Sequence, residues 1–335
     1  MPAEWELHEA TWISWPHAGG QSFPDSYDRV VPTLVKMASA LAESETLRIN
    51  IASPEQEREV KGYLSKSAPM DRVEFHHHPT NEPWCRDHGP IFVKRTDSPT
   101  LAVNDFGYNA WGGKYPPYDA DDIVPTRIAR DLGLPLFSPG FILEGGSVDP
   151  NGEGTLLTTE SCLLNPNRNP SMSRKQIEQG LRDYLGVEKI LWLGDGIEGD
   201  DTDGHVDDIT RFVSRDTVVT VVEPNHGDPN HRPLRENLER LREMTLADGT
   251  PLHVLEMPMP PRIDREGLRL PASHANFYIA NESVLMPAFG GNSDAVAADL
   301  LAGLFPSRMI RPIDCRELIW GLGAFHCLTQ QQPAA

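Results

Sequence analysis

The sequence predicts an α/β fold whose five modules close into a ring, as the blades of a propeller do. Amphipathic helical stretches recur along the 335 residues, and each is followed closely by a short hydrophobic strand. Each unit leads into a short polar motif, and the motifs stand 57, 61, 71 and 51 residues apart when measured between these residues: Asp87, Glu144, His205, Asn276 and Cys327. Residues 1–335 are therefore expected to form a single domain whose motifs meet at the axis. The alternative is an open α/β sheet in which the motifs lie apart.

The first two modules are predicted from helical periodicity. A helix is expected over residues 26–43, where apolar side chains recur on one face, and a strand over residues 47–52. An additional helix over residues 55–65 interrupts this first module. The second module is expected to contain a helix over residues 123–132 and a strand over residues 134–137.

The third helix has the clearest ends. Ser173 and Gln176 have the spacing of a capping box, in which each side chain bonds the backbone of the other residue. Gly186 is suited to close this helix, because glycine adopts the left-handed conformation of a C-terminal cap easily. A strand is expected after it, over residues 189–193.

The last two modules repeat the pattern. The fourth helix is expected over residues 233–246, with leucines aligned along one face. The remaining elements are expected as a strand, a helix and a strand, over residues 252–257, 294–304 and 309–313.

The composition describes a chain with one large core and an acidic surface. Hydrophobic residues make up 39% of the chain and charged residues 24%, which suffices to bury a core. The formal net charge is -19, from 30 basic and 49 acidic residues. This charge repels phosphate backbones and favours cationic partners, so we expect a small cationic ligand and no nucleic acid.

Targeting signals and paired-cysteine patterns are not found in the sequence. No apolar stretch is long enough to span a membrane, and residues 1–15 contain neither a basic leader nor an apolar targeting core. A cytoplasmic protein without a membrane partner is expected, and the oligomeric state stays open, a homo-oligomer included. Four cysteines are too few and too scattered for a disulfide framework or a paired zinc site, so at least one is a candidate for chemistry: Cys85, Cys162, Cys315 and Cys327.

Cysteine, histidine and several carboxylates in one pocket suit a guanidinium substrate. This cation is planar and keeps its proton, with a reference pKa of ~13, so a desolvated pocket must hold its N–H edges with carboxylates. Its central carbon is a weak electrophile, so attack requires a thiolate, which a nearby cation or histidine helps to form from a thiol of pKa ~8.5. A proton donor must then release ammonia, and an activated water must free the product from sulfur.

Seven short segments are together far more specific than any one of them. They are Met1-Pro2-Ala3-Glu4-Trp5-Glu6, Glu9-Ala10-Thr11-Trp12, Trp84-Cys85-Arg86-Asp87-His88-Gly89-Pro90, Tyr108-Asn109-Ala110-Trp111-Gly112-Gly113-Lys114, Glu144-Gly145-Gly146, Asp201-Thr202-Asp203-Gly204-His205-Val206-Asp207 and His326-Cys327-Leu328-Thr329-Gln330-Gln331-Gln332-Pro333. In these segments the chain resembles the agmatine deiminase family, which also contains a bacterial peptidylarginine deiminase and belongs to the pentein superfamily. The resemblance implies a fivefold pseudo-symmetric α/β propeller of ββαβ modules. It also implies a covalent amidino-cysteine intermediate and no metal or organic cofactor.

The resemblance assigns the catalytic roles residue by residue. Cys327 resembles the family nucleophile and His205 the general acid and base. Glu144 is expected to orient and charge His205, and Asp87 and Asp207 are expected to grip the guanidinium. These assignments predict hydrolysis of a guanidinium group to a ureido group and ammonia.

The resemblance also indicates the substrate-binding residues. Trp84 resembles the wall against the aliphatic chain, Asp201 the acidic group near the far end of the substrate, and Trp111 is a further candidate for the pocket. A carboxylate at the far end suits an amine, which favours agmatine over free arginine. Peptidylarginine and free arginine remain alternative substrates, and a non-catalytic protein that binds polyamines or basic ligands is the alternative from another class.

Two places depart from the family pattern. Leu322 and Phe325 stand in the segment before the cysteine, where the family is richer in glycine, and they are expected to narrow or reshape the pocket. His274 and Ala275 stand where the family usually has an aromatic residue after the serine. These departures put the identity of the substrate in doubt more than the chemistry.

Two further patterns suggest ligands but fit them poorly. The histidines of residues 76–78 are consecutive, and on a strand they point to alternate faces, so they cannot all bind one metal ion. Gly112-Gly113-Lys114 lacks the glycine spacing of a phosphate-binding loop. No metal or nucleotide site is therefore expected at either place.

Overall fold

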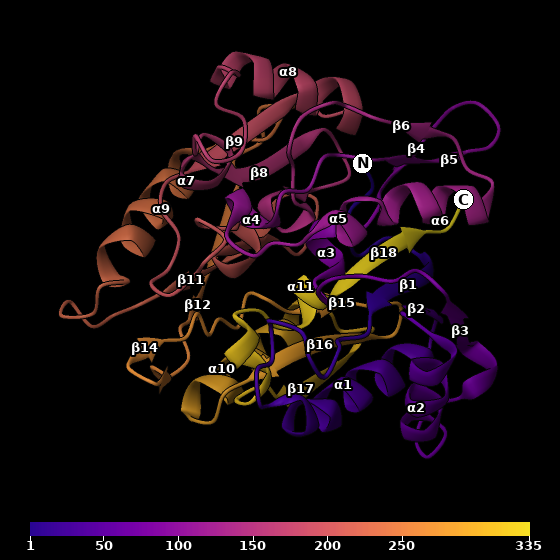
Figure 1. Cartoon of the computed structure of the whole chain (residues 1–335). Helices are drawn as coiled ribbons and strands as arrows, with labels where there is room; N and C mark the ends of the chain where they lie inside the picture. The colour runs from indigo at the N-terminus through magenta and orange to yellow at the C-terminus, as the bar shows by residue number, and fades with distance from the viewer.

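Five small mixed sheets surround the centre of the molecule in a computed structural model that describes residues 1–335 (Figure 1). Each sheet contains an antiparallel pair of strands and a third strand parallel to the second. The strands, in sheet order, are β18 (Thr329–Pro333), β1 (His8–Ser14), β2 (Thr46–Asn50) and β3 (Val73–His76); β4 (Ile91–Lys94), β5 (Leu101–Asn104) and β6 (Leu136–Phe137); β7 (Asp149–Pro150), β8 (Thr155–Thr159) and β9 (Lys189–Leu193); β10 (Thr210–Phe212), β11 (Thr217–Val222) and β12 (His253–Pro258); β15 (Tyr278–Ile279), β16 (Ser283–Ala288) and β17 (Met309–Asp314). The predicted α/β class with five modules is confirmed.

A helix joins the second and third strands of every sheet and lies at the periphery (Figure 1). These helices are α1 (Tyr27–Ala42), α6 (Val124–Leu132), α8 (Arg174–Leu185), α9 (His231–Glu243) and α10 (Asn292–Leu304), with α2 (Pro54–Leu64) added before β3. All six helices lie close to their predicted positions. Their inner faces bury leucine, isoleucine and valine side chains. The apolar periodicity predicted the helices because the same side chains pack against the core.

Cap residues explain where the helices end. The predicted capping box of Ser173 and Gln176 is present at the start of α8, and Gly186 closes that helix in the left-handed conformation with φ 66°. Helix α9 ends at Glu243, three residues before its predicted end. Met244 leaves the helix with extended backbone angles, φ -81° and ψ 152°.

The first sheet closes the ring. Its first strand, β18, comes from the last residues of the sequence and pairs antiparallel with β1, with Ala10 opposite Gln332 and Ile13 opposite Thr329. The first module is therefore assembled from both ends of the chain, whereas each of the other four modules is continuous in sequence.

Short turns before the first strand of each sheet bring the polar motifs to the centre. The turns are α3 (Cys85–His88), η2 (Gly145–Ser147), η3 (Val206–Asp208), residues 273–277 and α11 (Phe325–Leu328). Figure 1 shows α3 and α11 near the middle of the molecule, and α11 contacts α3, α3 contacts η2, and η2 contacts η3. The motifs therefore meet, as the ring predicts, and do not lie apart as in an open sheet.

The remaining elements are short. They are η1 (Met70–Arg72), α4 (Ala110–Gly113), α5 (Asp119–Asp122), α7 (Glu160–Leu163), η4 (Leu318–Gly321) and the hairpin of β13 (Asp264–Arg265) and β14 (Leu268–Arg269). None of the helices has the length and apolar character that a membrane crossing requires.

Candidate active site

A cavity of about 200 Å³ is lined by residues of α3 and α11 and by residues of the segments around 21–24, 111–115, 201–202 and 268–270. Five of the residues predicted for the site line it: Trp84, Asp87, Trp111, Asp201 and Cys327. The other three, Glu144, His205 and Asp207, are fully buried, and groups of His205 and Asp207 lie close to Asp87 and Cys327, as described below. The structure thus gathers all eight residues into one region from four different modules.

Asn276 positions Cys327 on α11. Its side-chain oxygen accepts hydrogen bonds from the backbone N–H groups of Ala324, His326 and Cys327 at 3.2, 3.1 and 3.3 Å, which caps the turn from another module. Its amide nitrogen donates to the Cys327 Sγ at 3.0 Å and to Asp208 Oδ1 at 2.9 Å. Asn276 stood in the fourth motif of the sequence, but its type alone did not indicate that it caps and contacts the cysteine turn.

Carboxylates surround the Cys327 thiol. Asp207 Oδ2 lies 3.7 Å from Sγ, and Asp208 and Asp87 are also close enough to act on it electrostatically. Burial, and then these negative charges, raise the pKa of Cys327 well above its usual value. In the free protein the sulfur therefore carries its proton, and a cation bound among the carboxylates would oppose their effect.

His205 and Asp87 form a buried pair, and each affects the pKa of the other. His205 Nδ1 lies 3.6 Å from Asp87 Oδ1, and neither ring nitrogen has a hydrogen-bond partner. Burial disfavours the imidazolium, yet the Asp87 carboxylate, then the nearby Cys162 sulfur and the Asp207 carboxylate, raise the pKa of His205 well above its usual value. Burial raises the pKa of Asp87 to about 6, although His205 acts in the opposite direction.

Two donors hold Asp87 in place. Trp111 Nε1 donates to Oδ2 at 2.9 Å, and the backbone N–H of Gly146 donates to Oδ1 at 3.0 Å. A side chain at position 146 would place its Cβ 2.6 Å from His205 Nδ1, 2.8 Å from Asp87 Oδ1 and 2.9 Å from Asp207 Oδ2. Glycine is therefore required there for space.

Glu144 has a partner that the sequence did not indicate. Arg168 donates from Nε to Glu144 Oε1 at 2.6 Å, and both side chains are completely buried. Glu144 Oε2 has no partner, and no hydrogen bond joins Glu144 to His205, although the two groups lie within 4.8 Å of each other. Arg168 follows an asparagine-rich segment without any local signal of burial, so only the tertiary structure identifies it.

Two aspartates before His205, Asp200 and Asp201, have different roles. Asp200 accepts hydrogen bonds from the backbone N–H groups of Thr202, Gly204 and His205 at 2.7, 3.0 and 3.2 Å, and so shapes the turn that presents the histidine. Asp201 instead lines the cavity, where its carboxylate accepts from the Tyr115 hydroxyl.

The departures from the family pattern differ in their distance from the cavity. Leu322 lines it, in a left-handed conformation with φ 70°. Phe325 and Ala275 are buried in the hydrophobic core, and His274 is buried with Nδ1 3.0 Å from the Pro287 carbonyl. None of these three lines the cavity. Phe325 therefore does not narrow the pocket directly, because it is buried in the core, and of these four residues Leu322 alone borders the cavity.

Potential metal ligands gather at two places. His76, His78 and Asp131 form one group and Glu144, Cys162 and His205 the other, with ligand atoms within 4.8 Å of one another. The alternation expected of consecutive histidines is present, since His77 contacts Glu57 instead. His78 already contacts Asn50 and Asp131 through its two nitrogens, at 2.9 and 2.8 Å. In the second group the Arg168 cation beside Glu144 disfavours a metal ion.

Comparisons with known proteins agree with this geometry. The family of Porphyromonas-type peptidyl-arginine deiminases matches residues 1–333. A relative from Legionella pneumophila, provisionally named agmatine deiminase, is 37% identical over 334 residues, which cover 99% of this chain and 94% of the relative. The agmatine deiminase structure from Enterococcus faecalis superposes with a TM-score of 0.91 at 33% identity, over 99% of this chain and 95% of that one.

Two further structures extend the comparison. A C. jejuni agmatine deiminase with a cysteine-to-serine substitution, solved with its substrate bound, gives a TM-score of 0.90 at 29% identity over 99% of this chain and 95% of that one. DDAH from Pseudomonas aeruginosa is 11% identical with a TM-score of 0.53 over 97% of this chain and 99% of that one, a likeness of fold alone.

Proposed function

Since the chain belongs to the Porphyromonas-type peptidyl-arginine deiminase family of the pentein superfamily, we propose that it hydrolyses agmatine to N-carbamoylputrescine and ammonia. Membership makes it a guanidino-group hydrolase of the agmatine deiminase type, and the choice of agmatine rests on the cavity. Three carboxylates line that cavity, those of Glu82, Asp87 and Asp201, and no lysine, arginine or histidine does. Agmatine carries a cation at each end, whereas the α-carboxylate of free arginine would meet no basic partner there.

The guanidinium is proposed to lie between Asp87 and Asp207 over Cys327. These carboxylates accept from its N–H edges, and Trp84 and Trp111 flank the aliphatic chain. The positive charge of the substrate offsets the carboxylates that raise the pKa of the Cys327 thiol, so binding favours loss of the thiol proton. The nucleophile is then formed where the electrophile already lies.

The proposed reaction proceeds in two displacements. The Cys327 thiolate bonds to the guanidinium carbon, and His205, protonated in the free enzyme, donates a proton to the nitrogen that leaves as ammonia. The neutral His205 then takes one proton from water, whose oxygen bonds to the same carbon. The sulfur leaves and takes up the remaining hydroxyl proton as the ureido carbonyl forms, and the proton that the thiol released to solvent on binding converts ammonia to ammonium. Overall, one guanidinium and one water give one ureido group and one ammonium ion.

Glu144 and Arg168 are proposed to stabilise the protonated form of His205. The Glu144 carboxylate stabilises the charged imidazole by its proximity, and Arg168 holds that carboxylate at 2.6 Å. The opposite charges of Glu144 and Arg168 compensate each other in the interior.

A substrate panel tests the proposal. Ammonia and ureido product are measured with agmatine, with free arginine and with an arginine peptide blocked at both ends. We expect agmatine to give the highest kcat/KM. Turnover confined to the blocked peptide would reject agmatine in favour of the peptidylarginine alternative.

A covalent probe separates an enzyme from a binding protein. A haloacetamidine reagent, a guanidinium mimic with a leaving group, is expected to label the folded protein at Cys327 and nowhere else, as read by peptide mass spectrometry. Cys327→Ala is expected to lose both labelling and turnover but still bind agmatine, because the carboxylates that grip the cation are intact. A wild-type protein that binds agmatine and is never labelled at Cys327 would favour the non-catalytic alternative.

A further inference from the structure

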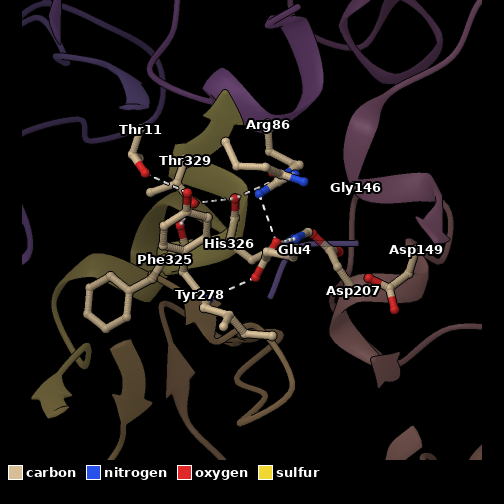
Figure 2. A network of polar contacts seen from close by, with 12 residues as sticks. Glu4, Thr11, Arg86, Gly146, Asp149, Asp207, Tyr278, Phe325, His326 and Thr329 are labelled. Carbon is tan, nitrogen blue, oxygen red and sulfur yellow. Dashed lines mark hydrogen bonds and ion pairs between the residues drawn. The ribbon is translucent and has the colours of Figure 1, made fainter. Parts of the chain in front are cut away.

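The segment before β1 reaches the centre of the ring through Glu4. This carboxylate is buried and accepts from Arg86 Nη2 at 3.1 Å and from the backbone N–H of Ile279 at 2.8 Å. It also lies 3.0 Å from Arg211 Nη2 and 2.8 Å from His326 Nε2. Figure 2 shows Glu4, Arg86 and His326 gathered in this network. Glu4 thus contacts residues of α3, β10, β15 and α11, which come from four different modules.

His326 lies between two carboxylates. Its Nε2 lies 2.8 Å from Glu4 Oε2, and its Nδ1 lies 2.6 Å from Asp207 Oδ2. Ionised carboxylates only accept hydrogen bonds, so the ring must donate from both nitrogens, which only the imidazolium can do. The side chain is 2% exposed, so water cannot replace either partner.

With His326 protonated, the groups that these contacts join carry equal numbers of positive and negative charges. The buried groups joined by these contacts are three carboxylates and three bases: Glu4, Asp149, Asp207, Arg86, Arg211 and His326. A neutral His326 would leave an excess negative charge in the interior, which is strongly unfavourable.

Only one of the two Asp207 carboxylate oxygens contacts His326. Oδ2 is taken by His326, whereas Oδ1 is buried and has no partner. Burial alone would raise the pKa of Asp207, but the hydrogen bond and the charge of His326 lower it below its usual value. An ionised carboxylate with one free oxygen is what a guanidinium N–H requires.

We propose that Glu4 and His326 are positioning residues for substrate capture. Glu4 holds His326 as an imidazolium, and His326 holds Asp207 ionised with Oδ1 free to accept from the guanidinium. The second half of this inference rests on the proposed function, whereas the protonation of His326 does not. A residue at position 4 of the sequence thereby controls a carboxylate 203 positions later.

The state of the ring is measured directly in the wild-type protein. Protein labelled with ¹⁵N at its histidines is studied by long-range ¹⁵N–¹H correlation at about pH 7.5. At this pH a free histidine is mostly neutral, because its pKa is about 6.5. His326→Asn, which removes one of the 12 histidines, identifies the signal. We expect both nitrogens of His326 to carry hydrogen in the wild type and only one in Glu4→Gln. One bare nitrogen in the wild type would overturn the proposal, whether or not the protein acts on agmatine.

The pH profile tests the effect on Asp207. The charged and titratable groups that face Asp207 are His326 and Cys327 on α11, Asp87 on α3, Arg211 on β10, and Asp200, His205 and Asp208 around η3. In the wild type, Asp87 alone of the two gripping carboxylates takes up a proton near pH 6, because its pKa is raised to about 6 and that of Asp207 is lowered. Loss of the His326 charge raises the pKa of Asp207, so a second gripping carboxylate takes up a proton as the pH falls and the acid limb should become steeper.

Glu4→Gln is expected to lower kcat/KM for agmatine about tenfold at neutral pH, mainly through KM, and to steepen the acid limb. His326→Asn keeps a neutral donor to Asp207, so it should share the steeper limb but recover KM at high pH. The matched control is Glu6→Gln, the same substitution two residues away, where the carboxylate contacts Ala3 and the exposed Lys94. It should leave the profile unchanged.

The outcomes separate the two proposals. Wild-type pH profiles in both Glu4→Gln and His326→Asn, each folded by its melting curve, would overturn the positioning role. A wild-type protein with a doubly protonated His326 that fails to hydrolyse agmatine would reject the proposed substrate and retain the imidazolium between Glu4 and Asp207.

Discussion

Asp87 is the residue of the site whose charge changes near neutral pH. Burial raises its pKa to about 6, while Trp111 and Gly146 keep both oxygens in place as hydrogen-bond acceptors. A protonated carboxyl group accepts less well and carries no charge to pair with a guanidinium. Since the pKa of Asp207 is lowered, Asp87 is the proposed gripping carboxylate that loses its charge first as the pH falls.

We predict that kcat/KM for agmatine falls as the pH drops through about 6, because a group with a raised pKa loses its charge early as acid is added. Asp87→Asn should lower kcat/KM at neutral pH by the loss of a buried charge partner, ~3–5 kcal/mol, and should abolish this limb. Measuring kcat/KM for both proteins across the transition checks the assignment. An unchanged limb in the variant would show that another group is responsible.

At the scale of elements, five short turns from different modules form the centre of the molecule, where the polar motifs meet. Each turn precedes the first strand of its sheet, and α11 contacts α3, α3 contacts η2, and η2 contacts η3. The turns approach so closely that backbone is needed where side chains would collide, as at Gly146 in η2. Catalytic geometry here depends on the packing of turns from different modules.

Gly146→Ala is expected to lower kcat/KM at least ~100-fold, because the added Cβ displaces His205 and Asp87, and to destabilise the fold by ~1–3 kcal/mol. Gly303→Ala in α10 is the control, since a Cβ there meets nothing within 4 Å. It should stabilise the helix by ~0.5–1 kcal/mol and leave activity intact. Steady-state kinetics and thermal melting of both variants provide the comparison, and a fully active Gly146→Ala would contradict the crowding at this turn.

At the scale of the whole molecule, the closure of the ring couples the two ends of the chain. Strand β18 pairs with β1, Trp12 Nε1 donates to Gln332 at 2.9 Å, and Arg86 Nη1 donates to Gln331 at 2.7 Å. The same closure places α11, with Cys327, beside α3. Folding of the first module therefore has to wait for the last strand.

A chain that stops after residue 328 keeps every proposed catalytic residue but loses β18. We expect it to unfold at a markedly lower temperature or to lose its cooperative transition, because β1 would become an edge strand paired only with β2 and Arg86 would lose Gln331. Removal of Ala335 alone, which lies beyond β18, is the control and should melt as the full chain does. A cooperative transition at the wild-type temperature in the shorter chain would refute the role of closure.

Local patterns determined the elements. The helices and the capping box were predictable because apolar periodicity and cap residues act over a few neighbouring positions. The spacing of the motifs predicted that they meet, and the resemblance to a family named Cys327, His205 and the carboxylates that the structure gathers around the cavity. Their catalytic roles stay predictions until the variants are measured.

The tertiary structure alone decided which groups contact the predicted site residues and their neighbours. Asn276 contacts Cys327 from 51 positions away, Arg168 pairs with Glu144, and Glu4 reaches His326 across nearly the whole chain. The sequence by itself specified the modules and the residue types of the site, because those follow from short-range periodicity and from motif order. It could not specify these partners, since the pairing of buried charges depends on distances in space that are set only when the ring closes.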